Sequence, residues 1–182
     1  SFIVLFIFFI FSYIYMNSNT GHKIKKRDNA NDVFITPLGL SKLHIDMIND
    51  KWNKSIWLDP CKNNGSYYNQ FPSDSIKEYC EILEDIDFFT FNKSIDVICG
   101  NPPYSILDKW IDKSIQLNPN VISYLIGQGA LTTRRIQKIE EAGYGLIKLH
   151  FTKVYKWYGM SYIVVFEKGT KSIIEYDRTV WR

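Results

Sequence analysis

The apolar run Val97-Ile98-Cys99-Gly100 is followed at once by Asn101-Pro102-Pro103-Tyr104. The run predicts a short buried strand, and the two prolines end it, because proline has no N–H to donate to a neighbouring strand. The carboxyl ends of strands in open α/β sheets are where ligands bind. An amide, two prolines and an aromatic ring at such a place therefore indicate a candidate site.

Each residue of 101–104 has a chemical use at a strand end. The prolines fix two φ angles at about −65°, which holds the neighbouring carbonyls in set directions. Asn101 adds a neutral acceptor, so that with a carbonyl it could accept both hydrogens of an exocyclic amino group, and Tyr104 offers a flat face for stacking on a base. The alternative is a Pro-Pro turn with a capping Asn and a packed Tyr, and residues 101–104 alone leave both interpretations open.

Short apolar runs alternate with amphipathic segments through residues 32–169. The predicted strands are 55–58, 78–82, 97–100, 121–126, 146–151 and 162–166, and the predicted helices are 38–49, 106–117 and 132–142. This alternation indicates an α/β fold in which helices cover both faces of a mostly parallel sheet. We expect Thr36 to cap the first helix, with Pro37 at its first position, and Gly143 to end the last.

The chain divides into three parts. Residues 1–31 hold an apolar stretch and a basic arm, residues 32–169 form the domain, and residues 170–182 form a tail. As a helix, residues 1–15 would reach about 22 Å, less than the hydrocarbon thickness of about 30 Å. We therefore expect Met16 to be the initiator and the stretch before it to be upstream translation, with a membrane anchor as the alternative.

Composition and charge narrow the class of protein. With 46% hydrophobic residues, the chain can bury a core, which argues against intrinsic disorder. Residues 73–100 carry seven acids and two bases, whereas residues 121–182 carry ten bases and five acids. This asymmetry would suit a polyanion on one side and a hydroxyl-rich ligand on the other, although solvated faces alone would also produce it. Three cysteines without metal-like spacing indicate reduced thiols inside a cell, so we expect a cytoplasmic protein.

A second group of candidate residues follows the strand at 55–58. Asp59 and the small-residue loop after it would bring backbone N–H groups close to a ligand beside a carboxylate. Asn63 tolerates positive φ nearly as glycine does. Glu81, about twenty residues further on, fits an acid that binds ribose hydroxyls, with Glu84 and Asp85 as competitors. An ordinary strand-to-helix loop is the other interpretation.

Three further segments carry candidate contacts. Asp87-Phe88-Phe89 joins an acid to two rings that could hold a heterocycle or belong to the core. The helix at 132–142 and the segment 152–161 carry bases, which in the second are interleaved with aromatics, a pattern suited to phosphate pairing and base stacking. A hairpin whose aromatics pack on the sheet remains the alternative. The candidate nucleic-acid contacts are Arg134, Arg135, Lys153, Lys156 and Trp157.

Taken together, these motifs resemble those of a known enzyme family. The segments Phe34-Ile35-Thr36-Pro37, Asp59-Pro60-Cys61 through Gly65, Glu81, Asp87-Phe88 and Asn101-Pro102-Pro103-Tyr104 occur in the order and spacing of S-adenosylmethionine-dependent amino-group methyltransferases. Over residues 32–169 the chain resembles short phage or viral DNA N6-adenine methyltransferases. The resemblance implies a Rossmann-like class I methyltransferase fold, with seven strands, helices on both faces and an antiparallel strand near the C-terminus. It also implies an adenine-specific DNA methyltransferase of the host cytoplasm or a viral factory.

The resemblance implies a role for each motif. Ten residues would hold S-adenosylmethionine: Phe34, Thr36, Pro37, Asp59, Pro60, Cys61, Gly65, Glu81, Asp87 and Phe88. The first three would close over its methionine end, the loop from Asp59 would cradle its amino-acid part, Glu81 would bind the ribose, and the last two would bind the adenine. The catalytic set would be Asn101, Pro102, Pro103 and Tyr104, with Asn101 and the Pro102 carbonyl on the target N6 and Tyr104 stacked on the flipped base. No metal is implied.

The chain departs from the family pattern in two ways. Asn63 stands where the first glycine of the cofactor loop is expected, and no segment offers room for a sizeable target-recognition domain. Selectivity would have to come from loops such as 127–135 and 152–161, or from a partner. The alternatives are RNA adenine or protein glutamine methylation with the same motif, and a catalytically silent protein that binds nucleic acid.

Overall fold

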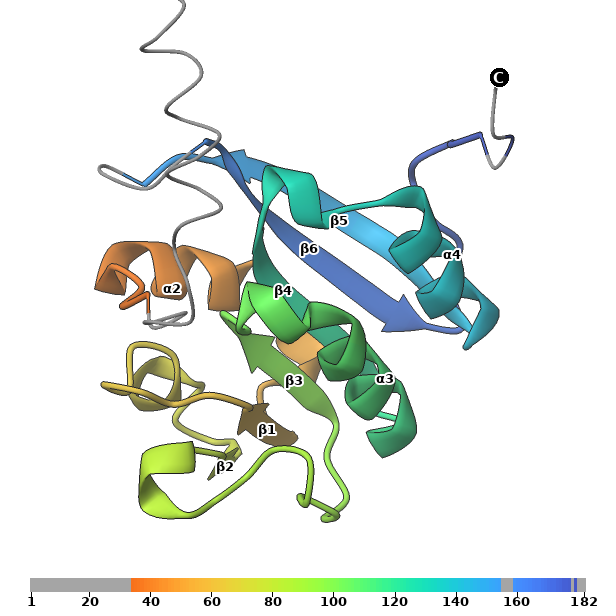
Figure 1. The fold of residues 1–182 in the computed structure, drawn as a ribbon. Coiled ribbons are helices and arrows are strands. Elements are labelled where there is room, and N and C mark those ends of the chain that lie inside the picture. The colour runs from red at the N-terminus through yellow and green to blue at the C-terminus, as the bar shows by residue number, and fades with distance from the viewer. Residues whose placement is uncertain (1–33, 155–158, 178, 180–182) are drawn as a thin grey trace, which may run out of the picture. The chain divides into compact units, whose positions relative to one another are not determined.

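The described residues form a six-stranded sheet with the order β2-β1-β3-β4-β6-β5 (Figure 1). A computed structural model describes residues 34–154, 159–177 and 179. The strands are β1 Ile56–Asp59, β2 Ile76–Tyr79, β3 Val97–Gly100, β4 Val121–Gly127, β5 Tyr144–Thr152 and β6 Ser161–Lys168. Each predicted strand is present, although β2 begins and ends earlier than expected.

The expected seventh strand is not found in the described residues, which corrects the prediction. The segment between β2 and β3 holds the 3-10 turn η3, Ile82–Glu84, and an isolated bridge between Glu81 and Ile86. Asp85 ends this turn in the left-handed conformation, with φ 59°. The segment therefore folds back on itself, and no run with the period of a strand remains.

The strand directions agree with the predicted fold class. β1 pairs in parallel with β2 and β3, and β3 pairs in parallel with β4. β6 runs antiparallel to both β4 and β5, which confirms the antiparallel strand expected near the C-terminus.

Helices cover both faces of the sheet, as predicted. The helices α3, Leu107–Leu117, and α4, Thr133–Glu141, lie together in front of the sheet in Figure 1. Their apolar residues pack with Leu58 and Ile98, whereas Ile45, at the end of the helix α2, Leu38–Asp46, packs with Trp57 and Val97. Successive strand residues thus face opposite layers, which explains why β1 and β3 read as continuous apolar runs.

A buried polar network joins α2 to the sheet. His44 is fully buried, with Nδ1 2.9 Å from the Tyr67 hydroxyl and Nε2 2.7 Å from Ser123 Oγ. Ser123 donates its proton to the Val164 carbonyl at 3.1 Å, so Nε2–H must donate to Ser123 and Nδ1 must accept from Tyr67. Burial lowers the pKa of His44 to about 3, so the ring is neutral.

Several expected local features differ in the structure. Pro37, not Thr36, occupies the N-cap of α2, and no side chain caps that end. The helix ends at Asp46, because Asn49 accepts from the Lys51 N–H and begins a separate turn, η1, Asp50–Trp52. The loop after Asp59 leads only into the short turn η2, Tyr68–Gln70. Gly143 does follow α4 with φ 92°, as predicted.

The C-terminal residues lie along one edge of the sheet. The Ile173 N–H donates to the Leu146 carbonyl at 2.9 Å, and the Leu146 N–H donates to Ser172 Oγ at 2.9 Å. Glu140 of α4 accepts from the hydroxyls of Ser172 and Tyr176. The backbone groups at the start of β5 are therefore partly paired, which protects an edge strand from pairing with other chains.

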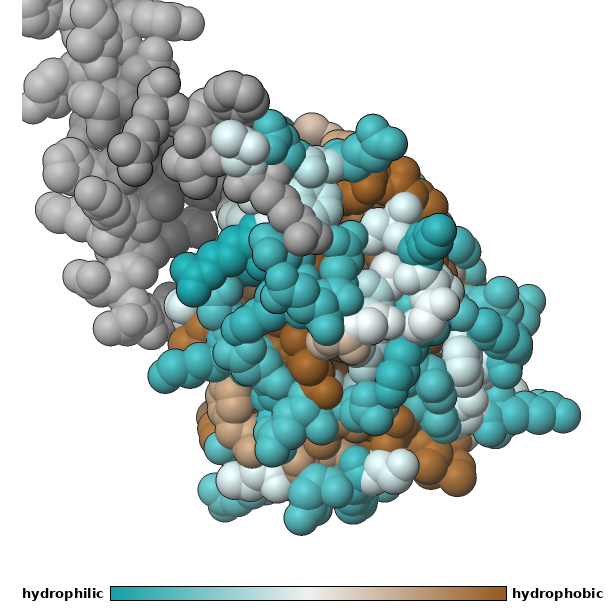
Figure 2. Space-filling model, turned by 90° about the vertical axis from the view of Figure 1, so that its right-hand side faces the viewer, coloured by the Kyte–Doolittle hydropathy of each residue, from teal (hydrophilic) through white to brown (hydrophobic). Residues whose placement is uncertain are grey.

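The face seen in Figure 2 is mainly hydrophilic, with small separate hydrophobic areas. Among the described residues, no helix is long and apolar enough to cross a membrane. The helix α3 has 11 residues, whereas a span needs about 20.

Candidate active site

The candidate residues gather where the parallel strands end. Asp59 is the last residue of β1, Glu81 follows β2, Asn101 follows β3, and Gly127 ends β4. Because these strands are parallel neighbours, their carboxyl ends lie on one edge of the sheet, where open α/β folds bind ligands.

Asp59 organises the loop that follows β1. Its side chain is 1% exposed, and its two oxygens accept from the backbone N–H groups of Cys61 and Tyr68, each at 3.2 Å. Burial raises the pKa of Asp59 to about 7, although both N–H bonds oppose the rise. The carboxylate therefore holds both ends of the loop.

The loop itself contains two residues with positive φ. Asn63 has φ 49° and Gly65 has φ 83°, so Asn63 does take a conformation usual for glycine. A Cβ on Gly65 would lie 2.5 Å from Asn69 Nδ2, so this position also lacks room for a side chain. The Asn63 N–H donates to Glu81 Oε2 at 2.6 Å, and the Leu83 N–H donates to Glu81 Oε1 at 3.1 Å. Glu81 thus joins the loop to the end of β2.

The loop and residues 101–104 are packed directly against each other. A Cβ on Gly100 would lie 3.0 Å from Pro60 Cδ and 3.2 Å from Asp59 Oδ1, so glycine permits the close approach. The Cys61 thiol donates to the Asn101 carbonyl at 3.0 Å. These contacts join two motifs about forty residues apart in sequence into one site.

The Asn101 side chain presents an acceptor without a partner. Its Nδ2 lies 3.4 Å from the Phe34 carbonyl oxygen and 3.3 Å from Thr36 Oγ1. Its Oδ1 is buried and has no hydrogen-bond partner among the described residues. Buried acceptors are nearly always paired in folded proteins, so an unpaired one at a strand end calls for an explanation.

Tyr104 lies over Phe34 at the same edge. The two rings stack at 6.5 Å between centroids with 23° between their planes, and the Tyr104 hydroxyl donates to the Leu125 carbonyl at 3.3 Å. A Cβ on Gly127 would lie 3.3 Å from Tyr104 Cε2. The ring is therefore held between the end of β4 and the segment before α2.

The residues expected around a nucleotide ring are divided between core and surface. Asp87 accepts from the Phe89 N–H at 2.9 Å. Phe88 is 2% exposed and packs on Trp110 at 4.5 Å, so its ring belongs to the core in this structure. Two other apolar residues are exposed: Ile82, which follows Glu81, is 68% exposed, and Phe89, two residues after Asp87, is 38% exposed. The sequence analysis did not single out Ile82, although it directly follows Glu81.

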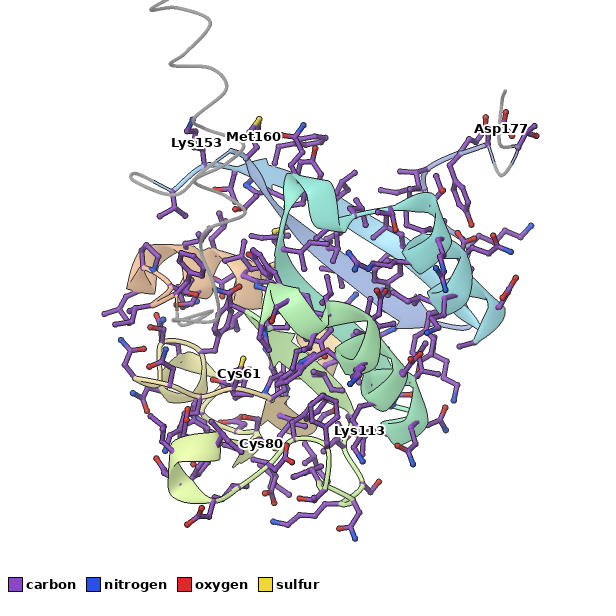
Figure 3. All side chains as sticks on the ribbon, in the orientation of Figure 1. Cys61, Cys80, Lys113, Lys153, Met160 and Asp177 are labelled. Carbon is purple, nitrogen blue, oxygen red and sulfur yellow. The ribbon has the colours of Figure 1, made fainter. Side chains whose placement is uncertain are left out.

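Of the five candidate nucleic-acid contacts, the structure describes Arg134, Arg135 and Lys153. Arg135 donates to both carboxylate oxygens of Asp108, at 2.8 and 3.1 Å, and to the Ala130 carbonyl, so it ties α4 to α3. Arg134 and Lys153 are exposed, and Lys153 lies beside Met160 where β5 ends and β6 begins (Figure 3). Lys156 and Trp157 lie outside the described residues.

Metal chemistry has no candidate cluster in the part of the chain that the structure describes. No group of three or more His, Cys, Asp or Glu side chains there could hold an ion. Cys61, Cys80 and Cys99 are all free thiols, and Figure 3 shows the first two. Burial raises the pKa of all three thiols, that of Cys80 to about 12, so they are poor nucleophiles.

Comparison with known proteins identifies the fold. No protein-family model and no curated protein matches the chain. A putative RNA methyltransferase from Pyrococcus horikoshii matches with a TM-score of 0.58 and 14% identity, over 78% of this chain and 90% of that one. The E. cuniculi Mtq2-Trm112 complex is described as responsible for methylating the translation termination factor eRF1. It matches with a TM-score of 0.59 and 17% identity, over 74% of this chain and 98% of that one. Magnesium protoporphyrin IX methyltransferase from Synechocystis with bound SAM matches with a TM-score of 0.55 and 11% identity, over 82% of this chain and 91% of that one.

At these identities the likeness establishes the fold alone. The described residues have the Rossmann-like fold of methyltransferases, as the resemblance implied.

Proposed function

We propose that this chain is an S-adenosylmethionine-dependent methyltransferase that acts on the N6 amino group of adenine in DNA. The observation that carries the proposal is the buried, unpaired Oδ1 of Asn101 at the carboxyl edge of a methyltransferase-type sheet. An acceptor left without a partner costs free energy that binding of an amino group would recover.

The residues present suit the proposed cofactor. The loop from Asp59 to Gly65 offers backbone groups beside a carboxylate for the amino-acid part, and Glu81 and Asp87 offer oxygens for the ribose and the adenine amino group. Phe34 borders the same edge through its contacts with Asn101 and Tyr104, and Pro37 lies in the same segment, at the N-cap of α2. When bound, S-adenosylmethionine supplies an electrophilic methyl group.

The chain's own part is to hold the acceptor nitrogen. Asn101 Oδ1 and the Pro102 carbonyl would accept the two amino hydrogens, which draws the nitrogen towards tetrahedral geometry and frees its lone pair for attack. Tyr104 would stack on the flipped base. Held in this way, the nitrogen would face the methyl group that the cofactor supplies, and its surplus proton would pass to solvent.

A second candidate keeps the chemistry and changes the acceptor. RNA adenine and the glutamine amide of a protein carry the same kind of NH₂ group, and a putative RNA methyltransferase and the Mtq2-Trm112 complex share the fold. In the described residues, Arg135 is already paired with Asp108, so fewer bases are available for phosphate than the sequence suggested.

Transfer of a labelled methyl group tests the proposal. The protein is incubated with labelled S-adenosylmethionine and, in turn, duplex DNA, single-stranded DNA, RNA and a glutamine-bearing release factor, and the products are digested and identified. We expect N6-methyladenine from DNA. Label found only in RNA or protein would assign the second candidate, and no label in any substrate would refute methyl transfer.

Asn101→Ala is the matched variant for that assay, with the exposed Asn92→Ala as control. Loss of an acceptor aimed at the reacting group should lower kcat about 100-fold or more, because such groups act chiefly in the transition state. Cofactor affinity should stay within a few-fold of wild type in both variants. Retained turnover in Asn101→Ala would remove Asn101 from the catalytic role.

A further inference from the structure

The orientation of the Asn101 amide is fixed by two neighbouring oxygens. The Phe34 carbonyl can only accept a hydrogen bond, so the Asn101 atom facing it at 3.4 Å must be the NH₂ nitrogen. Thr36 Oγ1 lies 3.3 Å from the same nitrogen. If the amide were turned over, Oδ1 would face these two oxygens, and the NH₂ group would occupy the unpaired position.

Thr36 lies in the segment just before α2, beside the Asn101 side chain. Its side chain is 3% exposed, so it offers little surface to a ligand. Pro37 follows at the N-cap of α2 with φ −56°, and the neighbouring Phe34 ring is stacked on Tyr104. The segment is therefore restrained on both sides of Thr36, and its hydroxyl is held where Asn101 can use it.

We propose that Thr36 is a positioning residue, whose hydroxyl, with the Phe34 carbonyl, holds the Asn101 NH₂ group so that Oδ1 faces the acceptor amine. This inference rests on the proposed function. It gives Thr36 a role through Asn101 instead of a direct contact with the cofactor. An NH₂ group in the place of Oδ1 would oppose an amino group with two donors, so the turned-over amide would be inactive.

Thr36→Val and Thr36→Ser separate the hydroxyl from the shape of the side chain. Valine keeps the volume and removes the oxygen, whereas serine keeps the oxygen. Because a single neutral hydrogen bond is lost while the Phe34 carbonyl remains, we expect kcat to fall about 3- to 10-fold in Thr36→Val. Thr36→Ser should restore kcat to within about twofold of wild type, and cofactor affinity should be unchanged in both.

Hydrogen exchange of the Asn101 side-chain NH₂ provides a readout independent of turnover. In protein with ¹⁵N-labelled asparagine, the signals of this group are identified by their loss in Asn101→Ala. We expect faster exchange in Thr36→Val than in wild type or Thr36→Ser. Wild-type kcat in Thr36→Val, equal exchange rates, or a loss of cofactor affinity in both variants would each overturn the inference. An absence of turnover in the wild type would instead refute the proposed function, while the exchange rates would still test the amide orientation.

Discussion

Asp59 is buried, and the nearby Lys62 lowers its pKa less than burial raises it. Its pKa rises from 3.8 to about 7, chiefly because burial disfavours the charged form. Between about pH 4 and pH 7 the folded state therefore binds more protons at this group than the unfolded state does. The contribution of Asp59 to stability is fully present below pH 4 and is lost as the pH rises through 7.

Replacement of Asp59 by asparagine should remove this dependence. We expect the free energy of unfolding of the wild type, relative to Asp59→Asn, to fall as the pH rises from 4 to 7 and to level off above it. Urea unfolding at a series of pH values gives the free energy of unfolding of both proteins. Taking the difference between them removes the contribution of other groups such as His44, whose lowered pKa makes stability rise with pH. The exposed Asp74→Asn is the control. A difference that stays constant from pH 4 to 8 would contradict the assigned pKa.

At the scale of elements, α2 is fixed to the sheet by the His44 network as well as by apolar packing. Ser123 of β4 accepts from His44 Nε2–H and donates to the Val164 carbonyl of β6, so one hydroxyl joins a helix and two strands. Because α2 begins shortly after Phe34 and Thr36, this network also helps to hold the segment that contacts Asn101.

Ser123→Ala should destabilise the fold measurably. The change leaves a buried N–H donor on His44 without a partner, which costs about 1–3 kcal/mol. Denaturant unfolding measures the loss, with the exposed Ser73→Ala as the matched surface change. A free energy of unfolding equal to that of Ser73→Ala would show that the network contributes nothing.

Local sequence patterns predicted those elements whose position is determined by a few neighbouring residues. The apolar run at 97–100 and its prolines gave the position of β3, and Gly143 marked the end of α4. The predicted strand at 78–82 was misplaced, because the backbone of Glu81 pairs with Ile86 instead of continuing β2. Thr36 is not the cap, because α2 begins one residue later than expected, with Pro37 at its N-cap. Its hydroxyl instead lies beside Asn101 Nδ2, 65 residues away, a contact that no local pattern reports.

At the scale of the whole sheet, the resemblance predicted the class of fold and the sequence predicted which strand ends carry polar groups. The resemblance implied seven strands, whereas the described residues form six, and the acid-rich segment after β2 makes the turn η3 and an isolated bridge. β1, β3 and β4, whose ends carry Asp59, Asn101 and Gly127, remain adjacent, and the candidate site therefore keeps its supporting strands.

Calorimetric titration of the folded protein with S-adenosylmethionine tests the central claim most directly. We expect saturable binding to one site, unchanged within a few-fold in Asn101→Ala and weakened about tenfold or more in Glu81→Ala, because Glu81 is assigned to the cofactor and Asn101 to the methyl acceptor. Circular dichroism of each variant confirms that it is folded. Absence of binding by the folded wild-type protein would contradict the account.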